Sequence, residues 1–242
     1  MFTPVRKIET VVDVCFSQLR EAILSGSIEV GSRLPPERKL AETLGVNRVT
    51  LRSALARLQL SGLVSVRQGS GTLVEDYRSC GGPELIGPLV AMAEGPGALA
   101  DLAEELLLVR RQMARIVLEH LSAGVDDAAL SIIEGRVDEF QEAVEEDASI
   151  GELALRDLAV FRALVGATGS TVFALFMNPV TRLLGEFEQL QKAIYSDSEQ
   201  SVMAYRHLIL WLRLDQRKPV DLIMQLMAAR DAMTVDRIRG GS

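Results

Sequence analysis

Residues 31–74 read GSRLPPERKLAETLGVNRVTLRSALARLQLSGLVSVRQGSGTLV, and this stretch decides the fold of the first part of the chain. The proline pair at 35–36 can only open a helix, and Gly45 can take the left-handed conformation that ends one. Asn47 or its neighbour can then cap a second helix, which Gly62 closes. Two short helices joined by a glycine turn predict a helix-turn-helix, with an earlier helical pattern before it.

The second of these helices is amphipathic. Its apolar residues repeat at i, i+3, i+4 and i+7, which places one face against a core: Leu51, Ala54, Leu55 and Leu58. The N-terminus and the opposite face carry polar and basic residues: Asn47, Arg48, Thr50, Arg52 and Ser53. Taken alone, such a helix is most simply a surface helix with a solvated polar face. The glycine turn before it and the β-rich sequence after it favour a DNA-recognition helix instead.

A β-hairpin is predicted directly after this helix. The β-rich runs 63–67 and 72–74 flank Gly69-Ser70-Gly71, a turn that needs positive φ. A glycine-rich turn can also cradle a nucleotide phosphate, but that site needs a lysine after the second glycine and a following helix, and neither is present. The hairpin therefore predicts the wing of a winged helix-turn-helix. The residues placed to reach an adjacent groove or phosphates are Arg67, Gln68 and Gly69.

The charge distribution divides the chain in the same way. The net charge of −7 argues against a nucleic-acid binder until the charges are located. From residue 33 to 67 there are seven basic and two acidic residues, an excess of five positive charges, whereas residues 78–242 carry 16 basic and 25 acidic residues, or −9. A basic module is thus joined to an acidic one, and the basic module contains the predicted recognition helix.

The sequence over residues 10–76 resembles the DNA-binding domain of the GntR family of bacterial transcription regulators. The resemblance implies double-stranded operator DNA as the partner. It implies base-reading arginines, whose planar fork matches the two major-groove acceptors of guanine, at Arg38, Arg48 and Arg52. It also implies polar contacts from Asn47 and Thr50, and a wing tip at Gly69. Because one recognition helix contacts too few base pairs to be specific alone, we expect a homodimer on a pseudo-palindromic site.

From residue 83 onward the pattern is helical throughout, with breaks that give about seven helices. Pro179 lies inside the fifth of them and predicts a kink there. We therefore expect an α+β winged helix-turn-helix over residues 1–77, a linker over 78–82, and an all-α bundle for effector binding and dimerisation over 83–242. The residues expected in the bundle core are Leu106, Leu107, Met113, Val117, Leu121, Leu208, Leu212, Leu222, Leu226 and Met227.

The order of the two domains resembles the FadR subfamily, and residues 154–176, ALRDLAVFRALVGATGSTVFALF, match it best. The resemblance implies a bundle that binds a small effector and carries much of the dimer contact. Many members hold a metal with an Asp and three His, but this chain has only His120 and His207. We therefore expect no zinc of that kind and no other cofactor.

Arg162, at the position of one of those histidines, resembles the metal-free branch whose ligand is an acyl-CoA. That branch has a glycine-, serine- and tryptophan-containing motif in its last helix, whereas residues 227–233 here read MAARDAM. An anion bound directly in a cavity is the preferred hypothesis, and the residues expected to bind it are Arg110, Arg162, His207 and Arg230. These residues could equally lie on the surface or pair with Asp157 and Glu186, and the bundle could serve dimerisation alone. A cavity with inward arginines would favour sensing.

Other classes of protein find little support in the sequence. There is no catalytic Ser-His-Asp or Cys-His set and no cofactor loop, so an enzyme is not expected. The long uncharged run 163–181 contains glycine, asparagine and proline, which suits a buried turn and helix better than a membrane span. Cys15 and Cys80 are far apart and no export signal is evident, so we expect reduced thiols in a cytoplasmic bacterial protein.

Overall fold

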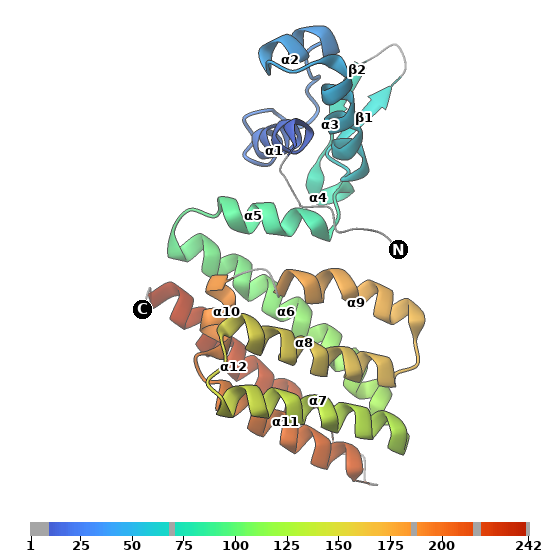
Figure 1. Ribbon diagram of the computed structural model, residues 1–242, viewed down its shortest axis with the longest axis vertical. Helices are drawn as coiled ribbons and strands as arrows, with labels where there is room; N and C mark the ends of the chain where they lie inside the picture. Colours follow the sequence, from blue (N-terminus) through green and yellow to red (C-terminus); the bar gives the residue numbers. More distant parts are fainter. Residues whose placement is uncertain (1–9, 68–70, 185–187, 215–218, 241–242) are drawn as a thin grey trace. The chain divides into compact units, whose positions relative to one another are not determined.

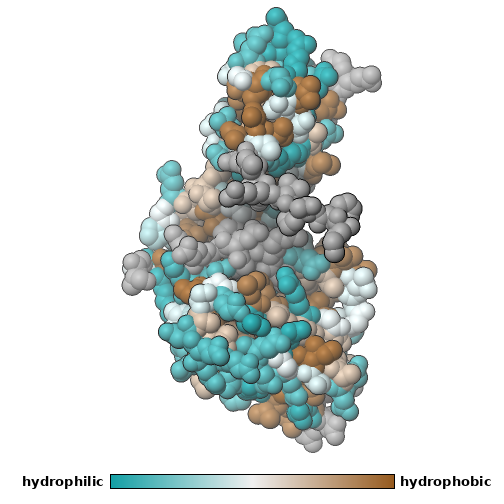
Figure 2. All heavy atoms as spheres, viewed as in Figure 1, coloured by the Kyte–Doolittle hydropathy of each residue, from teal (hydrophilic) through white to brown (hydrophobic). Residues whose placement is uncertain are grey.

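The computed structural model describes residues 10–67, 71–184, 188–214 and 219–240 (Figure 1). The chain forms two compact units, Met1–Met92 and Ala93–Ser242. On the face seen in Figure 2, polar residues cover much of the surface and hydrophobic residues gather in smaller patches. No helix in the described ranges has the length and hydrophobicity needed to cross a membrane.

The first unit is a winged helix-turn-helix, which confirms the predicted fold class for this part. Its elements are α1 (Val11–Leu24), α2 (Glu37–Thr43), α3 (Arg48–Leu60), β1 (Val64–Arg67), β2 (Gly71–Val74), α4 (Tyr77–Cys80), the 3₁₀ turn η1 (Pro83–Leu85) and α5 (Ile86–Met92). The two strands pair antiparallel, with Val64 opposite Val74 and Arg67 opposite Gly71. Residues 31–34 follow the other edge of β2, where the Leu34 amide donates to the Thr72 carbonyl at 2.9 Å.

Local interactions fix where the first helices begin. Thr10 and Asp13 form a capping box at the start of α1, in which the Thr10 amide donates to the Asp13 carboxylate at 2.8 Å. The same carboxylate accepts from the Arg57 guanidinium at 2.6 Å, which ties α3 to α1. The hydrogen bonds from Thr10, and then the Arg57 charge, lower the pKa of Asp13 well below its usual range. Between α2 and α3, Gly45 has φ +65°, as the predicted turn requires.

The core of the first unit contains the predicted apolar face of α3. Its buried members include Leu51, Ala54, Leu55 and Leu58, together with Ile23 of α1. Leu85 of η1 is buried in the same core, and Leu89 and Met92 of α5 pack against it. A methyl group added at Gly62 would lie 1.9 Å from the Cys80 carbonyl oxygen, so α4 is packed closely on the end of α3. The segment 78–82, expected as a linker, thus lies inside this unit, which extends to Met92.

The second unit is an all-α bundle, as predicted, and its described residues form seven helices. They are α6 (Gly95–Leu121), α7 (Asp127–Glu145), α8 (Ile150–Ala167), α9 (Thr171–Leu184), α10 (Glu188–Tyr195), α11 (Ser198–Arg213) and α12 (Val220–Gly240). Helix α6 packs along α12, and α7 packs along both α8 and α11 (Figure 1). Gly95-Pro96-Gly97, read as a break, is instead the first turn of α6. Pro179 lies inside α9, as predicted.

The core of the bundle surrounds Phe140, whose ring contacts those of Tyr195 and Tyr205 edge-on at centroid distances of 6.5 and 6.0 Å. Four of the expected core residues are buried: Leu106, Leu107, Val117 and Leu121. The expectation is wrong for Leu222 and Leu226, which are 61% and 66% exposed. Both side chains line a cavity rather than a filled core.

Leu58 and Leu60 of α3 offer a test of this packing. Leu58 is fully buried and Leu60 is 88% exposed. Leu58→Ala should lower the free energy of unfolding of the first unit by about 2–5 kcal/mol, because it leaves a cavity in the core. Leu60→Ala should change it by no more than about 0.5 kcal/mol. Urea denaturation followed by circular dichroism measures both, and equal losses would contradict the assigned faces of α3.

Candidate DNA-binding surface and ligand cavity

The outer surface of α2 and α3 is basic. Arg38 on α2 and Arg48 on α3 are exposed, and neither forms an ion pair with a residue that the structure describes. Arg52 is 69% exposed and donates through Nε to Glu37 at 2.8 Å. This pair joins α2 to α3 and sets the direction of the Arg52 side chain. Three predicted base-reading arginines are therefore accessible, one of them oriented by a carboxylate.

Asn47 and Thr50 lie at the N-terminus of α3. The side-chain Oδ1 of Asn47 accepts from the Thr50 backbone amide at 2.8 Å, so the side chain caps the helix. Asn47 is exposed and Thr50 is partly buried. Asn47 thus has a structural role besides its predicted contact, since it holds the first turn that carries Arg48.

The wing is the hairpin of β1 and β2. Arg67 is described as the last residue of β1, while Gln68 and Gly69 lie outside the described residues. The sequence reasoning did not single out Val49, which is 75% exposed beside Arg48. An apolar side chain here can contact a thymine methyl group. Its position outside the buried stripe of α3 is the signal that identifies it.

The second unit forms a partly open cavity of about 1030 Å³. Its walls come from α6 and from helices α8 to α12. Most of its lining side chains are aliphatic or aromatic, including Phe161, Leu164, Met177 and Trp211. This volume and composition are typical of a site for a small organic ligand.

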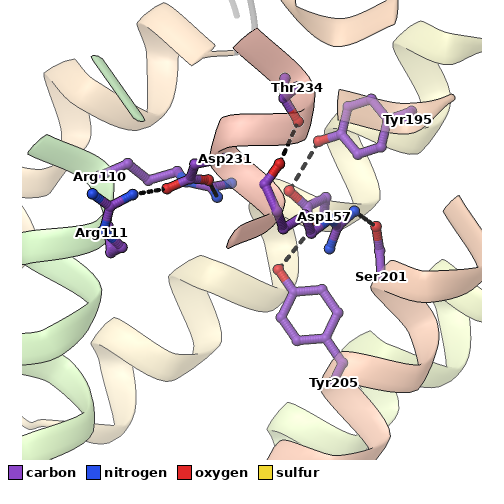
Figure 3. Close-up of polar contacts among 9 residues, drawn as sticks. Arg110, Arg111, Asp157, Tyr195, Ser201, Tyr205, Asp231 and Thr234 are labelled. Carbon is purple, nitrogen blue, oxygen red and sulfur yellow. Dashed lines mark hydrogen bonds and ion pairs between the residues drawn. The ribbon is translucent and has the colours of Figure 1, made fainter. Parts of the chain in front are cut away.

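One region of the cavity wall is polar and centres on Asp157 of α8. The Asp157 carboxylate accepts hydrogen bonds from the hydroxyls of Tyr195 and Tyr205, at 2.9 and 2.6 Å (Figure 3). Burial and the neighbouring carboxylate raise the pKa of both tyrosines well above the usual range. Both hydroxyls therefore remain protonated, and each donates a hydrogen bond to the Asp157 carboxylate.

A second polar group joins α6 to α12. Arg110 donates to Asp231 at 2.9 Å, and Arg111 donates to the other oxygen of the same carboxylate (Figure 3). Asp231 is 5% exposed, so two guanidinium groups compensate a buried charge. The neighbouring Arg230 donates to the Ser201 hydroxyl of α11 and lines the cavity.

The structure brings together three of the four predicted effector residues. Arg110, His207 and Arg230 all line the cavity. Arg162 is exposed on α8 and is not among the residues that line it. Asp157 pairs with tyrosines, and Glu186 lies outside the described residues. The sequence reasoning missed Tyr195, Ser201, Tyr205 and Asp231, because nothing in a single sequence shows which helix faces meet.

Comparisons with known proteins agree with this architecture. Residues 13–74 match the model of bacterial regulatory proteins of the gntR family. An HTH-type transcriptional regulator of Mycobacterium tuberculosis is 35% identical over 181 residues, which cover 75% of this chain and 71% of that protein. The chain belongs to the GntR family. As a GntR-family protein it is a DNA-binding transcription regulator.

Two further matches extend over the helical unit of this GntR-family chain. The fatty acid metabolism regulator protein of Klebsiella pneumoniae subsp. pneumoniae is 27% identical over 230 residues, covering 85% of this chain and 92% of that protein. The solved structure of Lar, which controls expression of the agr system of Listeria monocytogenes, covers 97% of both chains with a TM-score of 0.55 and 15% identity. At this identity the Lar structure supports the fold alone.

The buried ion pair between α6 and α12 should stabilise the bundle. Asp231→Asn leaves two guanidinium groups of about one-fifth exposure without a carboxylate, and should cost about 2–3 kcal/mol of unfolding free energy. Asp221→Asn on the same helix removes a partner of Arg115 that is 69% exposed, and should cost less than about 1 kcal/mol. Chemical denaturation of both variants measures these losses. If Asp231→Asn lowers the free energy of unfolding no more than Asp221→Asn does, the buried ion pair does not stabilise the bundle.

Proposed function

We propose that this GntR-family regulator binds a pseudo-palindromic operator as a homodimer and responds to a small anionic effector bound in the cavity of its second unit. Two observations carry the proposal: the exposed arginines of α2 and α3, and a cavity lined by arginine side chains. A regulator of chromosomal DNA acts in the cytoplasm, where we place the protein.

On the DNA side, α3 is proposed to enter the major groove. Arg48 and Arg52 then present their guanidinium groups to guanine O6 and N7, and Glu37 orients Arg52 for this contact. Arg38 approaches from α2, and Val49 contacts a thymine methyl group. The remaining contacts proposed are Asn47 and Thr50 at the helix N-terminus and Arg67, Gln68 and Gly69 in the wing.

The homodimer follows from the small footprint of one recognition helix. A single helix reads only a few base pairs, which is too little to distinguish an operator within a genome. Two copies related by a twofold axis double the sequence that is read and predict a pseudo-palindromic site.

The cavity favours the hypothesis that the bundle binds an effector over the hypothesis that it only dimerises. A bundle used for dimerisation alone has no need of a partly open cavity of about 1030 Å³ whose wall contains arginine, tyrosine and aspartate side chains. Arg110, Arg230 and His207 form the proposed anion-binding set, and Arg162 is left out because it lies outside the cavity wall. The relatives named fatty acid metabolism regulators support an effector with an aliphatic part.

The recognition-helix assignment can be tested with one variant and a control on the same helix. Arg48→Ala should weaken binding to an operator selected from random DNA by about 1–3 kcal/mol and relax the preference for guanine. Gln59 is exposed at the far end of α3, so Gln59→Ala should leave the operator affinity and the preference for guanine unchanged. Fluorescence anisotropy at one fixed salt concentration measures affinity, and the saturation point gives the number of protomers per site. Unchanged affinity of Arg48→Ala, or one protomer per operator, would count against the proposal.

Sensing can be tested by titrating the same operator with and without aliphatic carboxylates. A true effector should change operator affinity by roughly 5- to 150-fold, the usual size of such coupling. Arg162→Ala should keep this response, since Arg162 lies outside the cavity. If no carboxylate or acyl-CoA changes the operator affinity of the wild-type protein, the bundle serves dimerisation alone.

A further inference from the structure

We propose that Arg33 contacts a phosphate of the operator backbone, from the segment 31–34 that pairs with the free edge of the wing. The contact extends the DNA-binding surface beyond α2, α3 and the hairpin, and it adds affinity without reading the base sequence. The inference rests on the proposed placement of α3 in the major groove and of the wing at the adjacent groove. Four features support it: the fixed backbone of the segment, the outward direction of Arg33, its position between the elements proposed to contact DNA, and its free charge.

The backbone of segment 31–34 is fixed against β2. Three backbone hydrogen bonds, each 2.9 Å long, join residues 31, 32 and 34 to Thr72 and Val74. Arg33 lies directly opposite Leu73 in this pairing. The segment is therefore held in place before DNA binds, so a contact made by Arg33 costs side-chain entropy but no ordering of the backbone.

Arg33 points away from the core of the first unit. Successive residues of an extended segment lie on opposite faces. Leu34 is 6% exposed and belongs to the same core as Val64 and Val74, whereas Arg33 is exposed. Directly opposed residues of an antiparallel pair share a face, so Leu73 lies on the outer face together with Arg33. The guanidinium group is thus accessible to a ligand that approaches from outside.

This segment lies between the two elements proposed to contact DNA. Leu73, opposite Arg33, is two residues from Gly71, the first residue of β2, which is about 7 Å along the strand toward the wing turn. In the other direction, Arg33 is four residues before Glu37, which begins α2 and holds Arg52 at 2.8 Å. With α3 in the major groove and the wing at the adjacent groove, the sugar-phosphate backbone that separates the grooves passes between these elements.

The charge of Arg33 is available to a ligand. It belongs to a group of basic residues that are exposed and form no ion pair with a residue that the structure describes: Arg33, Arg38, Lys39 and Arg48. In the second unit, in contrast, most of the described arginines lie within ion-pair distance of a carboxylate. An arginine without an internal partner can bind a phosphate, and release its counterions, without breaking an ion pair.

Two carboxylates on neighbouring segments are engaged elsewhere. Glu75 accepts a hydrogen bond from the Ser65 hydroxyl, and Glu37 pairs with Arg52. Glu75 follows the last residue of β2 and is farther from the wing turn than the residue opposite Arg33. A negative charge that repels phosphate therefore borders the proposed contact on the side away from the turn. The DNA backbone is expected on the other side, toward α2 and the wing turn.

A phosphate contact can be told from a base contact by its salt dependence. The full-length protein is titrated by fluorescence anisotropy against the selected operator and a scrambled duplex of equal length, from about 50 to 200 mM salt. Arg33→Gln should weaken binding to both duplexes by the same factor, at least about threefold at the lower salt concentration. The slope of log affinity against log salt should become less steep by about 0.9 for each protomer, or about 1.8 for a dimer.

Two further variants control for charge and for position. Arg33→Lys keeps the positive charge and should keep the salt slope of the wild type for both duplexes. Arg78 is also exposed in the first unit, but it lies in α4, next to Cys80, which packs on the C-terminal end of α3. Arg78→Gln should therefore leave both the affinity and the slope unchanged.

Three results would overturn the phosphate contact. The first is a salt slope that Arg33→Gln does not change. The second is a loss of affinity confined to the operator, because Arg33 would then read a base. The third is an equal loss of affinity in Arg33→Lys, because the effect would then be structural. Failure of the proposed placement of α3 is seen separately, as unchanged operator affinity of Arg48→Ala.

Discussion

Charged side chains in a poorly solvated interior must each find a partner, and the second unit is organised around this constraint. Asp231 is almost completely buried, and two arginines of α6 compensate it from one side. Asp157 is compensated in a different way, by two tyrosine hydroxyls that remain protonated. These contacts join α6 to α12 and α8 to α10 and α11. Arg110, Asp157, Tyr195 and Tyr205 therefore both line the cavity and take part in the contacts between helices.

In the first unit, ion pairs at the surface hold helices and side chains in place. Asp13 caps α1 and also accepts from Arg57, whose guanidinium lies 4.3 Å from the centre of the Phe16 ring. This contact orients α3 on α1 from the side opposite to the exposed arginines. Glu37 then fixes Arg52 between α2 and α3. Exposed pairs of this kind add little stability, but they limit the directions in which a recognition side chain can point.

The winged helix-turn-helix could be predicted from the sequence because its signals are local. Helix caps, glycine turns and apolar spacing within α3 are all short-range, and the structure has them where the sequence places them. The cavity could not be predicted in the same way. Tyr195 meets Asp157 across α10 and α8, and Arg110 meets Asp231 across α6 and α12, and both contacts depend on how the helices pack. Apolar periodicity assigned Leu226 to the core, since a helix face toward a cavity has the same pattern as one toward a filled interior.

A hollow bundle also couples its stability to what it binds. Side chains that line a partly open cavity have fewer dispersion contacts than the same side chains in a filled core. A ligand that binds only the folded bundle adds such contacts and stabilises it, by about 2.7 kcal/mol at a concentration one hundred times its dissociation constant. The gain is largest for a ligand whose apolar part packs against the aliphatic and aromatic side chains that line the cavity. Affinity for such a ligand and the stabilisation that it gives to the bundle therefore arise from the same contacts.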